Sequence, residues 1–368
     1  MSRYQTQGAQ TSAVRPFSYE ALPGRVVFAP GARSLVDEEL DRLGVSSVLV
    51  VASPHDQELV GELCRAIGAR LAGRFDAVAA HVPIAVAEQA RALARSVDAD
   101  CVLTLGGGSA TGTAKAIALE LPLPIVAVPT TYAGSEMTPI WGLTEANRKT
   151  TGRSQQVLPR TVIYDPELTL AMPVSLAGPS AMNALAHCVE ALYAPGANPV
   201  CSVLAGEGIR ALAQGIRAVV VEPGEIGGRS LTLYGAYLAG VCLAGAGTAL
   251  HHRICHVLGG AFDLPHAEMH TIVLPQVVAF LEPAAQPELR RAAEALELTT
   301  TSELAGALFD LAQETGAPTA LSEIGLGERQ LAQAVELVLE TAPPAQPRPV
   351  SSEDLTELLG NAIRGTRP

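Results

Sequence analysis

The sequence has 368 residues, of which 48% are hydrophobic and 17% are charged. This length leaves room for two domains, and this composition is typical of a compact globular protein rather than a disordered chain. The formal net charge of −12 excludes the broad basic surface that nucleic-acid binding needs. An anionic substrate would therefore need a local cluster of Arg, Lys or His side chains.

The six cysteines, at positions 64, 101, 188, 201, 242 and 255, include no CxxC pair. Neither a disulfide framework nor a zinc knuckle is expected, and reduced thiols indicate a cytoplasmic protein. Residues 1–17 are polar and lack the apolar core of a secretory signal.

The first half of the chain alternates short β-branched runs with amphipathic segments. This alternation predicts a parallel sheet with helices on its faces. We place the end of this N-terminal α/β domain, residues 1–172, near Met172-Pro173. The expected strands are Arg25–Phe28, Ser47–Val51, Cys101–Leu105, Ile125–Val128 and Thr161–Tyr164, and the expected helices lie near 34–43, 56–71, 85–97 and 110–120.

Residues 173–368 carry helical patterns and no comparable strand signal, which predicts an all-α C-terminal domain. Ser230–Leu250 is uncharged and long enough to cross a bilayer. Because four glycines interrupt it and no basic flank orients it, we interpret it as a buried central helix and expect no membrane contact. Ala342–Val350 is Pro-rich and predicts a loop. The expected helices are about 174–193, 200–219, 230–246, 249–260, 273–281, 286–296, 302–315, 328–341 and 352–364.

A glycine-rich loop follows the third expected strand and opens a helix, with Gly106, Gly107, Gly108 and Ser109 in succession. Glycines let a pyrophosphate approach the backbone closely, and the helix N-terminus supplies free N–H groups. The loop matches neither the GxGxxG nor the Walker pattern, so an ordinary glycine turn is the competing interpretation. The strand–loop–helix context favours phosphate binding.

Hydroxyl groups follow the neighbouring strands. Thr130, Thr131 and Ser135 come after the strand that ends near residue 128 and are suited to ribose and phosphate contacts. Ser53 stands where a dinucleotide site often carries an acid for the adenosine ribose. Since an acid there would repel a 2′-phosphate, serine predicts that both NADH and NADPH are accepted.

Five of the eight histidines lie between positions 251 and 270. His252 and His256 are four residues apart and share one face of a helix, and Asn183 and His187 repeat this spacing. His266 follows in a Pro-His pair. Helical turns that present nitrogen and oxygen atoms to one cavity are typical of a metal site or a hydride-transfer site.

These blocks resemble the iron-containing alcohol dehydrogenase superfamily and, within it, the maleylacetate reductase branch. The resemblance covers nearly the whole chain, and its most specific blocks are residues 157–168, 182–195 and 251–270. It implies an N-terminal Rossmann-like domain, a helical C-terminal domain and an NADH or NADPH cofactor in the cleft between them. It also implies a homodimer.

In the metal-dependent relatives, one aspartate and three histidines bind the ion. The positions that match them here are Asn183, His187, His252 and His266, while His256 matches a histidine near the nicotinamide. The neutral amide of Asn183 removes the one anionic ligand and much of the attraction for a divalent cation. The reductase branch also carries Asn, so we expect no required metal, although weak Zn²⁺ or Fe²⁺ binding stays open.

The resemblance implies an anionic dicarboxylate substrate, maleylacetate or a substituted maleylacetate, whose conjugated C=C bond is reduced to give 3-oxoadipate in the degradation of aromatic compounds. Hydride addition pushes negative charge onto the ketone oxygen. We assign His252 or His256 as enolate donor and proton source. His187 and His266 are assigned as orienting or carboxylate-binding groups, and Arg253 as the anion anchor.

Several neighbours keep a second interpretation. Arg253 could instead pair with an acid such as Asp263, and His270 could line the site or simply pack. His251 is expected to face away from the direction of His252, being about 100° round the helix, and could be structural. Cys255 has apolar neighbours and is expected to be an inert buried thiol.

Three other functions fit parts of the pattern. A metal-dependent alcohol dehydrogenase acting on a carbonyl would lose its activity to a chelator. A non-redox enzyme resembling dehydroquinate synthase would not consume NADH stoichiometrically. A cofactor-binding protein without turnover would have no use for both the glycine loop and the histidine cluster.

Overall fold

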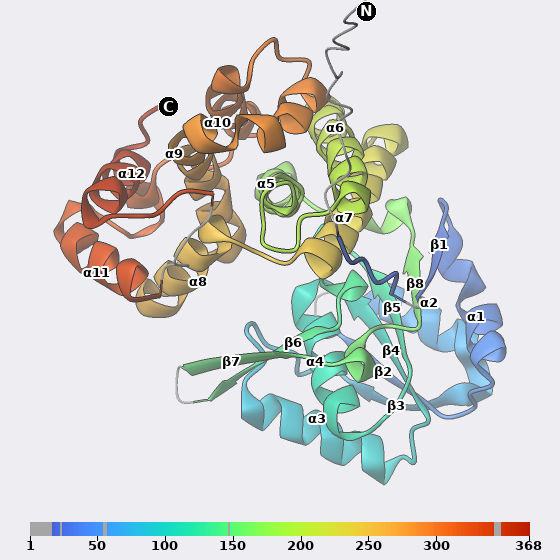
Figure 1. Cartoon of the computed structure of the whole chain (residues 1–368). Coiled ribbons are helices and arrows are strands. Elements are labelled where there is room, and N and C mark those ends of the chain that lie inside the picture. Colours follow the sequence, from blue (N-terminus) through green and yellow to red (C-terminus); the bar gives the residue numbers. More distant parts are fainter. Residues whose placement is uncertain (1–16, 23, 54–56, 146–147, 342–346) are drawn as a thin grey trace, which may run out of the picture.

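The computed structural model describes residues 17–22, 24–53, 57–145, 148–341 and 347–368. Figure 1 shows a half built on a parallel sheet and a half built of helices. The change from strands to helices falls between Tyr164 and Val174. Residues 1–16, where no signal sequence is expected, and 342–346 of the expected loop lie outside the described residues.

The main sheet has six parallel strands in the order β1-β8-β5-β4-β2-β3. The four interior strands β2, β4, β5 and β8 are buried along their whole length, as expected of a sheet that is covered on both faces. The strands are β1 (Arg25–Phe28), β2 (Val48–Ala52), β3 (Leu71–Phe75), β4 (Cys101–Gly106), β5 (Ile125–Pro129) and β8 (Thr161–Tyr164).

Helices cover both faces of this sheet. Val48 and Val50 of β2 pack in the core that includes residues of α1 and α2, whereas Leu49 and Val51 pack in the core that includes residues of α3 and α4. Alternate residues of a strand point to opposite faces, so each pair of helices covers one face. The helices are α1 (Val36–Leu43), α2 (Gln57–Ile67), α3 (Ile84–Ser96) and α4 (Gly108–Glu120).

Three strands were not predicted from the sequence. The helix expected up to residue 71 ends at Ile67, Gly68 adopts a φ of +53°, and β3 follows at the edge of the sheet. β6 (Ile140–Glu145) and β7 (Arg148–Arg153) form an antiparallel hairpin. β7 is polar and carries no hydrophobic alternation. Gly152 lies opposite Trp141, and a Cβ there would come within 2.5 Å of the indole ring.

The helical half surrounds α5, in which every residue from Ala177 to Ala191 is buried (Figure 1). The two helices expected at 273–281 and 286–296 are one helix, α9, which begins at His266 and bends at Ala285. The helices are α5 (Val174–Ala191), α6 (Pro199–Val221), α7 (Ile226–Ala246), α8 (Leu250–Phe262), α9 (His266–Ala295), α10 (Leu304–Glu314), α11 (Leu331–Thr341) and α12 (Ser352–Arg364).

Within the described ranges, none of the helices is by itself long and apolar enough to cross a membrane. α7 and α8 together would meet that criterion of length and composition, but they are bent by 99° where they join.

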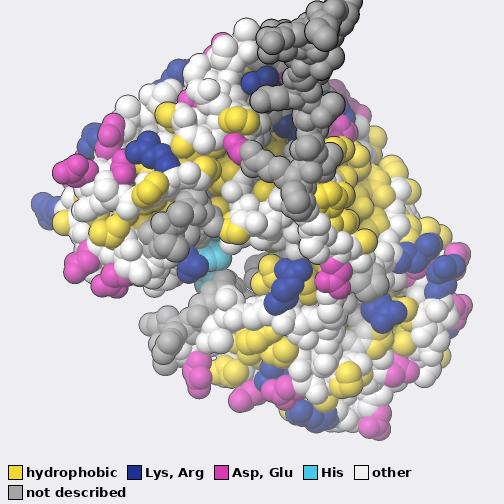
Figure 2. Space-filling view, in the orientation of Figure 1, with side chains coloured by type: hydrophobic (Ala, Val, Ile, Leu, Met, Phe, Trp, Pro, Cys, Tyr) yellow, Lys and Arg dark blue, Asp and Glu magenta, His cyan; other side chains and the backbone are white. Residues whose placement is uncertain are grey.

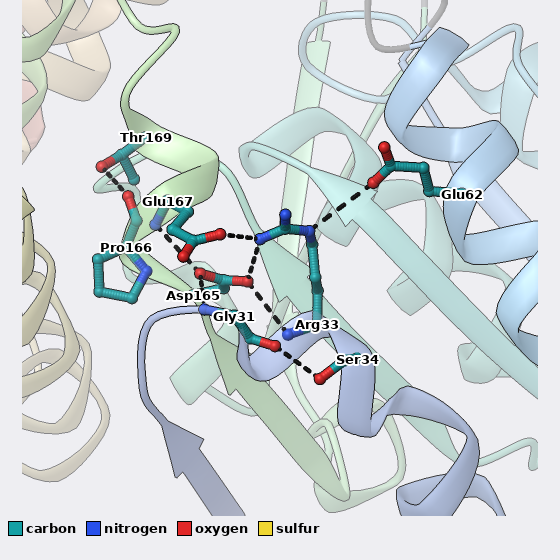
Figure 3. Close-up of polar contacts among 8 residues, drawn as sticks. All are labelled: Gly31, Arg33, Ser34, Glu62, Asp165, Pro166, Glu167 and Thr169. Atoms are coloured by element: carbon teal, nitrogen blue, oxygen red, sulfur yellow. Dashed lines mark hydrogen bonds and ion pairs between the residues drawn. The ribbon is translucent and has the colours of Figure 1, made fainter. Parts of the chain in front are cut away.

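A buried carboxylate ties β1 to β8 at the carboxyl edge of the sheet (Figure 3). Asp165 accepts hydrogen bonds from the backbone N–H groups of Gly31 at 2.9 Å, Arg33 at 3.2 Å and Glu167 at 3.1 Å. The guanidinium of Arg33 also donates to it at 2.8 Å, and continues to Glu167 and to Glu62 of α2. Each oxygen of Asp165 therefore has two donors, so this network holds strands together and leaves no acceptor for a ligand.

The loop after β5 joins the two halves. Gly134 lies so close to Gly240 of α7 that a Cβ on Gly240 would fall 2.7 Å from the Gly134 carbonyl oxygen. The backbone N–H of Tyr132 donates to the Ser180 hydroxyl of α5 at 3.3 Å. Arg153 of β7 donates to a backbone carbonyl of α7 at 2.9 Å. These contacts set the sheet edge against the helices that carry the histidines.

Candidate active site

The glycine-rich loop lies between β4 and α4. β4 ends at Gly106, whose φ of +140° lies in the region that favours glycine, and α4 begins at Gly108. No described side chain caps α4 at Gly107, so the N–H groups of its first turn, including that of Ser109, can face an anion. This geometry fits the phosphate-binding interpretation.

The other residues predicted to bind the cofactor gather around this loop. The N–H of Thr130 donates to the Gly106 carbonyl at 3.1 Å, and a Cβ on Gly107 would fall 2.9 Å from the Thr131 hydroxyl oxygen. Ser53 follows β2 on the other side, with its backbone nitrogen 4.0 Å from the place of a Cβ on Gly106. The absent glycine side chains therefore leave a cradle between three neighbouring strand ends.

Lys115 of α4 fixes the segment that contains Ser135. Its Nζ donates to the backbone carbonyls of Ser135 at 2.6 Å, Thr138 at 2.7 Å and Ile140 at 2.8 Å. Burial lowers the pKa of Lys115 to about 7, and the charge of Glu136 opposes that shift. The Ser135 hydroxyl lies 3.3 Å from the same Nζ, which places Ser135 in the support of the loop.

Imidazole rings from three helices meet in the helical half. His187 of α5 stacks on His252 of α8, with ring centroids 4.4 Å apart and an interplanar angle of 25°. His270 of α9 lies 4.6 Å from His252 and 4.8 Å from His251, and His266 lies 4.3 Å from His270. Figure 2 shows histidine side chains in a hollow between the two halves of the molecule.

The expectation that His251 faces away from the site is wrong. His251 is buried, and its Nε2 lies 2.9 Å from Nδ1 of His270. Successive residues of α8 are rotated by about 100°, and this rotation points the His251 ring towards α9, which packs along α8. His270, for which lining and packing were both open, lies in the middle of the cluster.

Three side chains lie at the exposed edge of this cluster. His256, whose ring centroid is 5.9 Å from that of His252, is exposed on α8, and His266 is exposed at the start of α9. Arg253 is exposed between the histidines of α8 and forms no ion pair with a described residue, Asp263 included. The pairing considered as an alternative is therefore absent, and the guanidinium is available to an anion.

Three of the buried rings, those of His187, His251 and His270, are neutral at pH 7. Burial lowers the pKa of His187, His251 and His270 well below the usual value of histidine, and the neighbouring imidazoles lower it further. A neutral imidazole has one donor nitrogen and one acceptor nitrogen. The cluster can therefore both donate to and accept from a bound polar group.

Several buried polar atoms of the cluster have no hydrogen-bond partner among the described residues. Buried polar atoms are almost always paired in folded proteins, because leaving one unpaired costs about 1–3 kcal/mol. Such atoms gathered in one place mark the position where a polar ligand would bind. They are Asn183 Oδ1, His187 Nδ1, His251 Nδ1, His252 Nε2 and His270 Nε2.

Sequence reasoning missed Glu190. This residue of α5 is fully buried, and its Oε1 accepts the backbone N–H of His252 at 3.2 Å. Its Oε2 is hydrogen-bonded to Nδ1 of the same histidine. One signal was present in the sequence: Glu190 lies three residues after His187 and is the single acid among residues 174–191 of α5.

The residues at the family's metal positions do not form a metal centre as arranged. His187 and His252 are stacked face to face, whereas ligands of one ion would turn their nitrogens to a common point. Asn183 is neutral, and both oxygens of the buried carboxylate nearest to these rings, Glu190, already accept from His252. We therefore derive no step that passes through a metal.

The described His, Cys and acidic groups that do converge are His251, Cys255 and His270, with ligand atoms within 4.8 Å of one another. The two imidazoles are already hydrogen-bonded to each other. Burial, and then the charge of Glu190, raises the pKa of the Cys255 thiol well above its usual value. A buried, protonated thiol agrees with the expected inert cysteine.

Two family models match the chain. The model "Iron-containing alcohol dehydrogenase" matches residues 23–166, and "Fe-containing alcohol dehydrogenase family, C-terminal" matches residues 179–363. The two matched segments follow the division into a sheet half and a helical half.

Named relatives span nearly the same length. The maleylacetate reductase of Pseudomonas sp. strain P51 is 46% identical over 352 residues, covering 96% of this chain and 99% of the relative. Maleylacetate reductase 1 of Cupriavidus pinatubonensis is 43% identical over 355 residues, with the same coverage. The crystal structure of the maleylacetate reductase of Rhizobium sp. strain MTP-10005 superposes with a TM-score of 0.92 at 43% identity, covering 96% of this chain and 100% of that one.

Proposed function

The chain belongs to the iron-containing alcohol dehydrogenase family, and from that premise we propose that it reduces the conjugated C=C bond of maleylacetate, or of a substituted maleylacetate, to give 3-oxoadipate. NADH or NADPH supplies a hydride when bound in the cleft. One further proton from the protein or water completes the reduction, and the oxidised cofactor leaves.

The cluster of incompletely bonded imidazoles carries this proposal. The reaction places negative charge on the ketone oxygen, and that oxygen needs preorganised donors in a site that excludes water. His252 and His270 are buried side by side, and each has an unpartnered Nε2. When they carry a proton, these nitrogens can donate to a bound substrate oxygen without help from an ion.

The exposed side chains of the cluster suit the two carboxylates of the substrate. Arg253 can bind a carboxylate bidentately because it has no described acidic partner. His256 and His266 lie at the same edge and can act as hydrogen-bond donors to the second carboxylate. His252 is then the proton source, and His187, stacked against it, keeps its ring in place. Asn183 offers an unpartnered amide oxygen beside them.

We propose that both NADH and NADPH are accepted. The cradle of Gly106–Ser109 with Thr130 and Thr131 fits a pyrophosphate, and Ser53 at the end of β2 carries no charge to repel a 2′-phosphate. Comparable values of kcat/KM with the two cofactors would support this assignment. A preference of more than about 1,000-fold, or about 4 kcal/mol, would contradict it.

The decisive experiment follows the near-ultraviolet absorbance of NADH with maleylacetate, before and after treatment with a chelator. We expect stoichiometric oxidation that the chelator leaves unchanged. Abolition by the chelator, restored by Fe²⁺ or Zn²⁺, would favour a metal-dependent alcohol dehydrogenase. Failure to oxidise either NADH or NADPH would contradict the proposed reaction.

We also propose a cytoplasmic homodimer. The six cysteines are unpaired. Apolar side chains are exposed on α5 and α6, where Val203 keeps 57% of its surface and Leu176 and Val200 are exposed as well. Figure 2 shows an apolar area over this part of the molecule. Light scattering after size exclusion should give twice the chain mass of 38.1 kDa, and a monomer would contradict the proposal.

A further inference from the structure

We propose that Glu190 is a positioning residue that holds the ring of His252 with its proton on Nδ1 and thereby turns Nε2 towards the cleft. The kinetic consequence of this inference rests on the proposed function. Its structural part, which nitrogen carries the proton, can be tested on the resting protein alone.

The geometry is a two-point contact between one carboxylate and one residue. Oε1 of Glu190 accepts the backbone N–H of His252 at 3.2 Å, and Oε2 is bonded to Nδ1 of its ring. Both side chains are buried, so water does not compete for either contact. Because backbone and ring are gripped together, the carboxylate fixes the rotation of the imidazole as well as its distance.

The chemistry of the carboxylate decides the tautomer. An ionised carboxylate only accepts hydrogen bonds, so Nδ1 of His252 must be the donor. In the neutral ring the lone pair then lies on Nε2, the atom that has no partner among the described residues. A proton added at Nε2 makes an imidazolium, and the negative charge of Glu190 stabilises it.

The neighbours of Glu190 do not offer another ionic partner. Burial raises the pKa of both Tyr193 and Cys255 well above their usual values, and the charge of Glu190 adds to that shift in each case. Both groups therefore stay protonated and neutral. The Tyr193 hydroxyl has no hydrogen-bond partner among the described residues. Among the described residues, His252 is thus the one from which the Glu190 carboxylate accepts hydrogen bonds.

Substitution of Glu190 by glutamine keeps the size of the side chain but replaces one of its two accepting oxygens by a donor. A glutamine at 190 has one accepting oxygen and one donating NH₂ group. If the oxygen serves the backbone N–H of His252, the NH₂ faces Nδ1 and drives the ring proton to Nε2. If the amide is reversed, a buried N–H is left facing a donor. The first arrangement loses the proton on Nδ1, and the second keeps it only with two buried donors facing each other.

The predicted effect falls on turnover rather than on cofactor binding. A neutral ring with its proton on Nε2 still donates a hydrogen bond to the enolate oxygen, but it cannot give that proton up without becoming an anion. Loss of the orienting carboxylate behind a functional histidine costs at least about tenfold and, in the serine protease triad, far more. Since Glu190 does not belong to the phosphate cradle, the KM for NADH should stay the same.

The test combines ring-nitrogen NMR with kinetics. In ¹⁵N-labelled wild type we expect a proton on Nδ1 of His252, assigned by its absence from His252→Gln. We expect Glu190→Gln to lower kcat at least about tenfold with the KM for NADH unchanged, and Glu190→Asp to recover part of the loss. Glu39→Gln is the matched control, because Glu39 of the distant helix α1 is a buried acid paired with Arg25 of β1.

Each outcome decides the inference. A wild-type His252 whose Nδ1 carries no proton, or wild-type kcat in a folded Glu190→Gln, would overturn it. If Glu190→Gln does not fold, the spectrum of the wild type decides alone. If the wild type does not oxidise NADH with maleylacetate, the proposed function fails, while the tautomer of His252 still confirms or overturns the positioning role.

Discussion

Two buried polar networks of this molecule are built from similar groups and serve different ends. Around Asp165 each carboxylate oxygen has two donors, and the network ties strands of the sheet together (Figure 3). Around Glu190 the carboxylate is also fully used, but the imidazoles beyond it end in unpartnered atoms. In the first network, which we call closed, every carboxylate oxygen is paired. In the second, which we call open, the carboxylate is paired but imidazole nitrogens towards the cleft are not.

This difference teaches which buried polar group to suspect of function. Burial alone does not separate the two, since Asp165 and Glu190 are both fully buried. The difference lies in the donors and acceptors that stay unpaired, each of which costs stability unless a ligand completes it. Substitutions in the open network should therefore cost activity, whereas substitutions in the closed network should cost stability.

The largest effect is expected from His252→Ala. Removal of a group that donates a proton in the reaction typically lowers the rate between about 100- and 10,000-fold. We expect kcat to fall within that range. The free energy of unfolding should fall as well, because the buried Glu190 carboxylate loses the ring to which it is bonded. Turnover measured beside urea unfolding separates the two quantities, and near-normal turnover would remove His252 from the mechanism.

Asp165→Asn is the converse experiment. The amide can no longer serve all four donors, and breaking a buried pair on one side costs about 3 kcal/mol. We expect a loss of about that size in unfolding by urea, with kcat preserved in the folded fraction. Glu62→Gln is the control, because Glu62 lies 3.8 Å from the same arginine but is exposed, so its loss should cost less than about 1 kcal/mol. Equal losses of unfolding free energy in the two variants would show that the complete pairing of Asp165 does not matter for stability.

Gly240→Ala tests the contact that places the two networks relative to each other. The added Cβ would fall 2.7 Å from the Gly134 carbonyl oxygen, so the backbone must move. Overpacking of this kind costs about 1–3 kcal/mol. We expect the KM for NADH to rise together with this loss, since the cofactor loop moves too. Gly224→Ala, where nothing lies within 4 Å, should leave both quantities unchanged.

Acid should weaken the open network in a narrow pH window. The pKa of His187, His251 and His270 is lower in the folded protein than in the unfolded chain, so the unfolded state binds more protons as the pH falls. Their contribution to stability is therefore complete above pH 6.5 and is lost below it. Because the unfolded chain can bind up to three more protons at these rings than the folded protein, the slope should approach about 4 kcal/mol per pH unit.

Unfolding free energies measured between pH 7.5 and pH 5 give this slope directly. The window lies above the range in which most carboxylates titrate, so they contribute little. The variant His270→Asn should reduce the slope, and a flat profile in the wild type would contradict the assignment of neutral buried rings.

Much of the architecture could be predicted because its signals are local. The buried strands are β-branched runs, and consecutive glycines directly after one of these strands indicate the phosphate loop. β3 and the β6–β7 hairpin escaped prediction because Gly73 interrupts the first and polar side chains dominate β7. Their pairing is settled by neighbouring strands and not by their own composition.

The parts of the site that could be predicted are those that depend only on the spacing of residues along one helix. The pairs Asn183–His187 and His252–His256 follow from helical periodicity. The inward direction of His251 depends on where α9 packs, and the role of Glu190 depends on a contact across 62 positions of the chain. Neither can be seen in a single helical pattern, although an acid within an apolar helix is a signal worth following.

The central helix α5 limits how this protein can change. Residues from Ala177 to Ala191 have no solvent face, and Asn183, His187 and Glu190 stand among them. A substitution that changes the shape of α5 at the site also changes the core of the helical half, so directed evolution should find few tolerated variants there. New substrate preferences should arise instead from Arg253 and from the first turn of α9, where a side chain can be exchanged without repacking the interior.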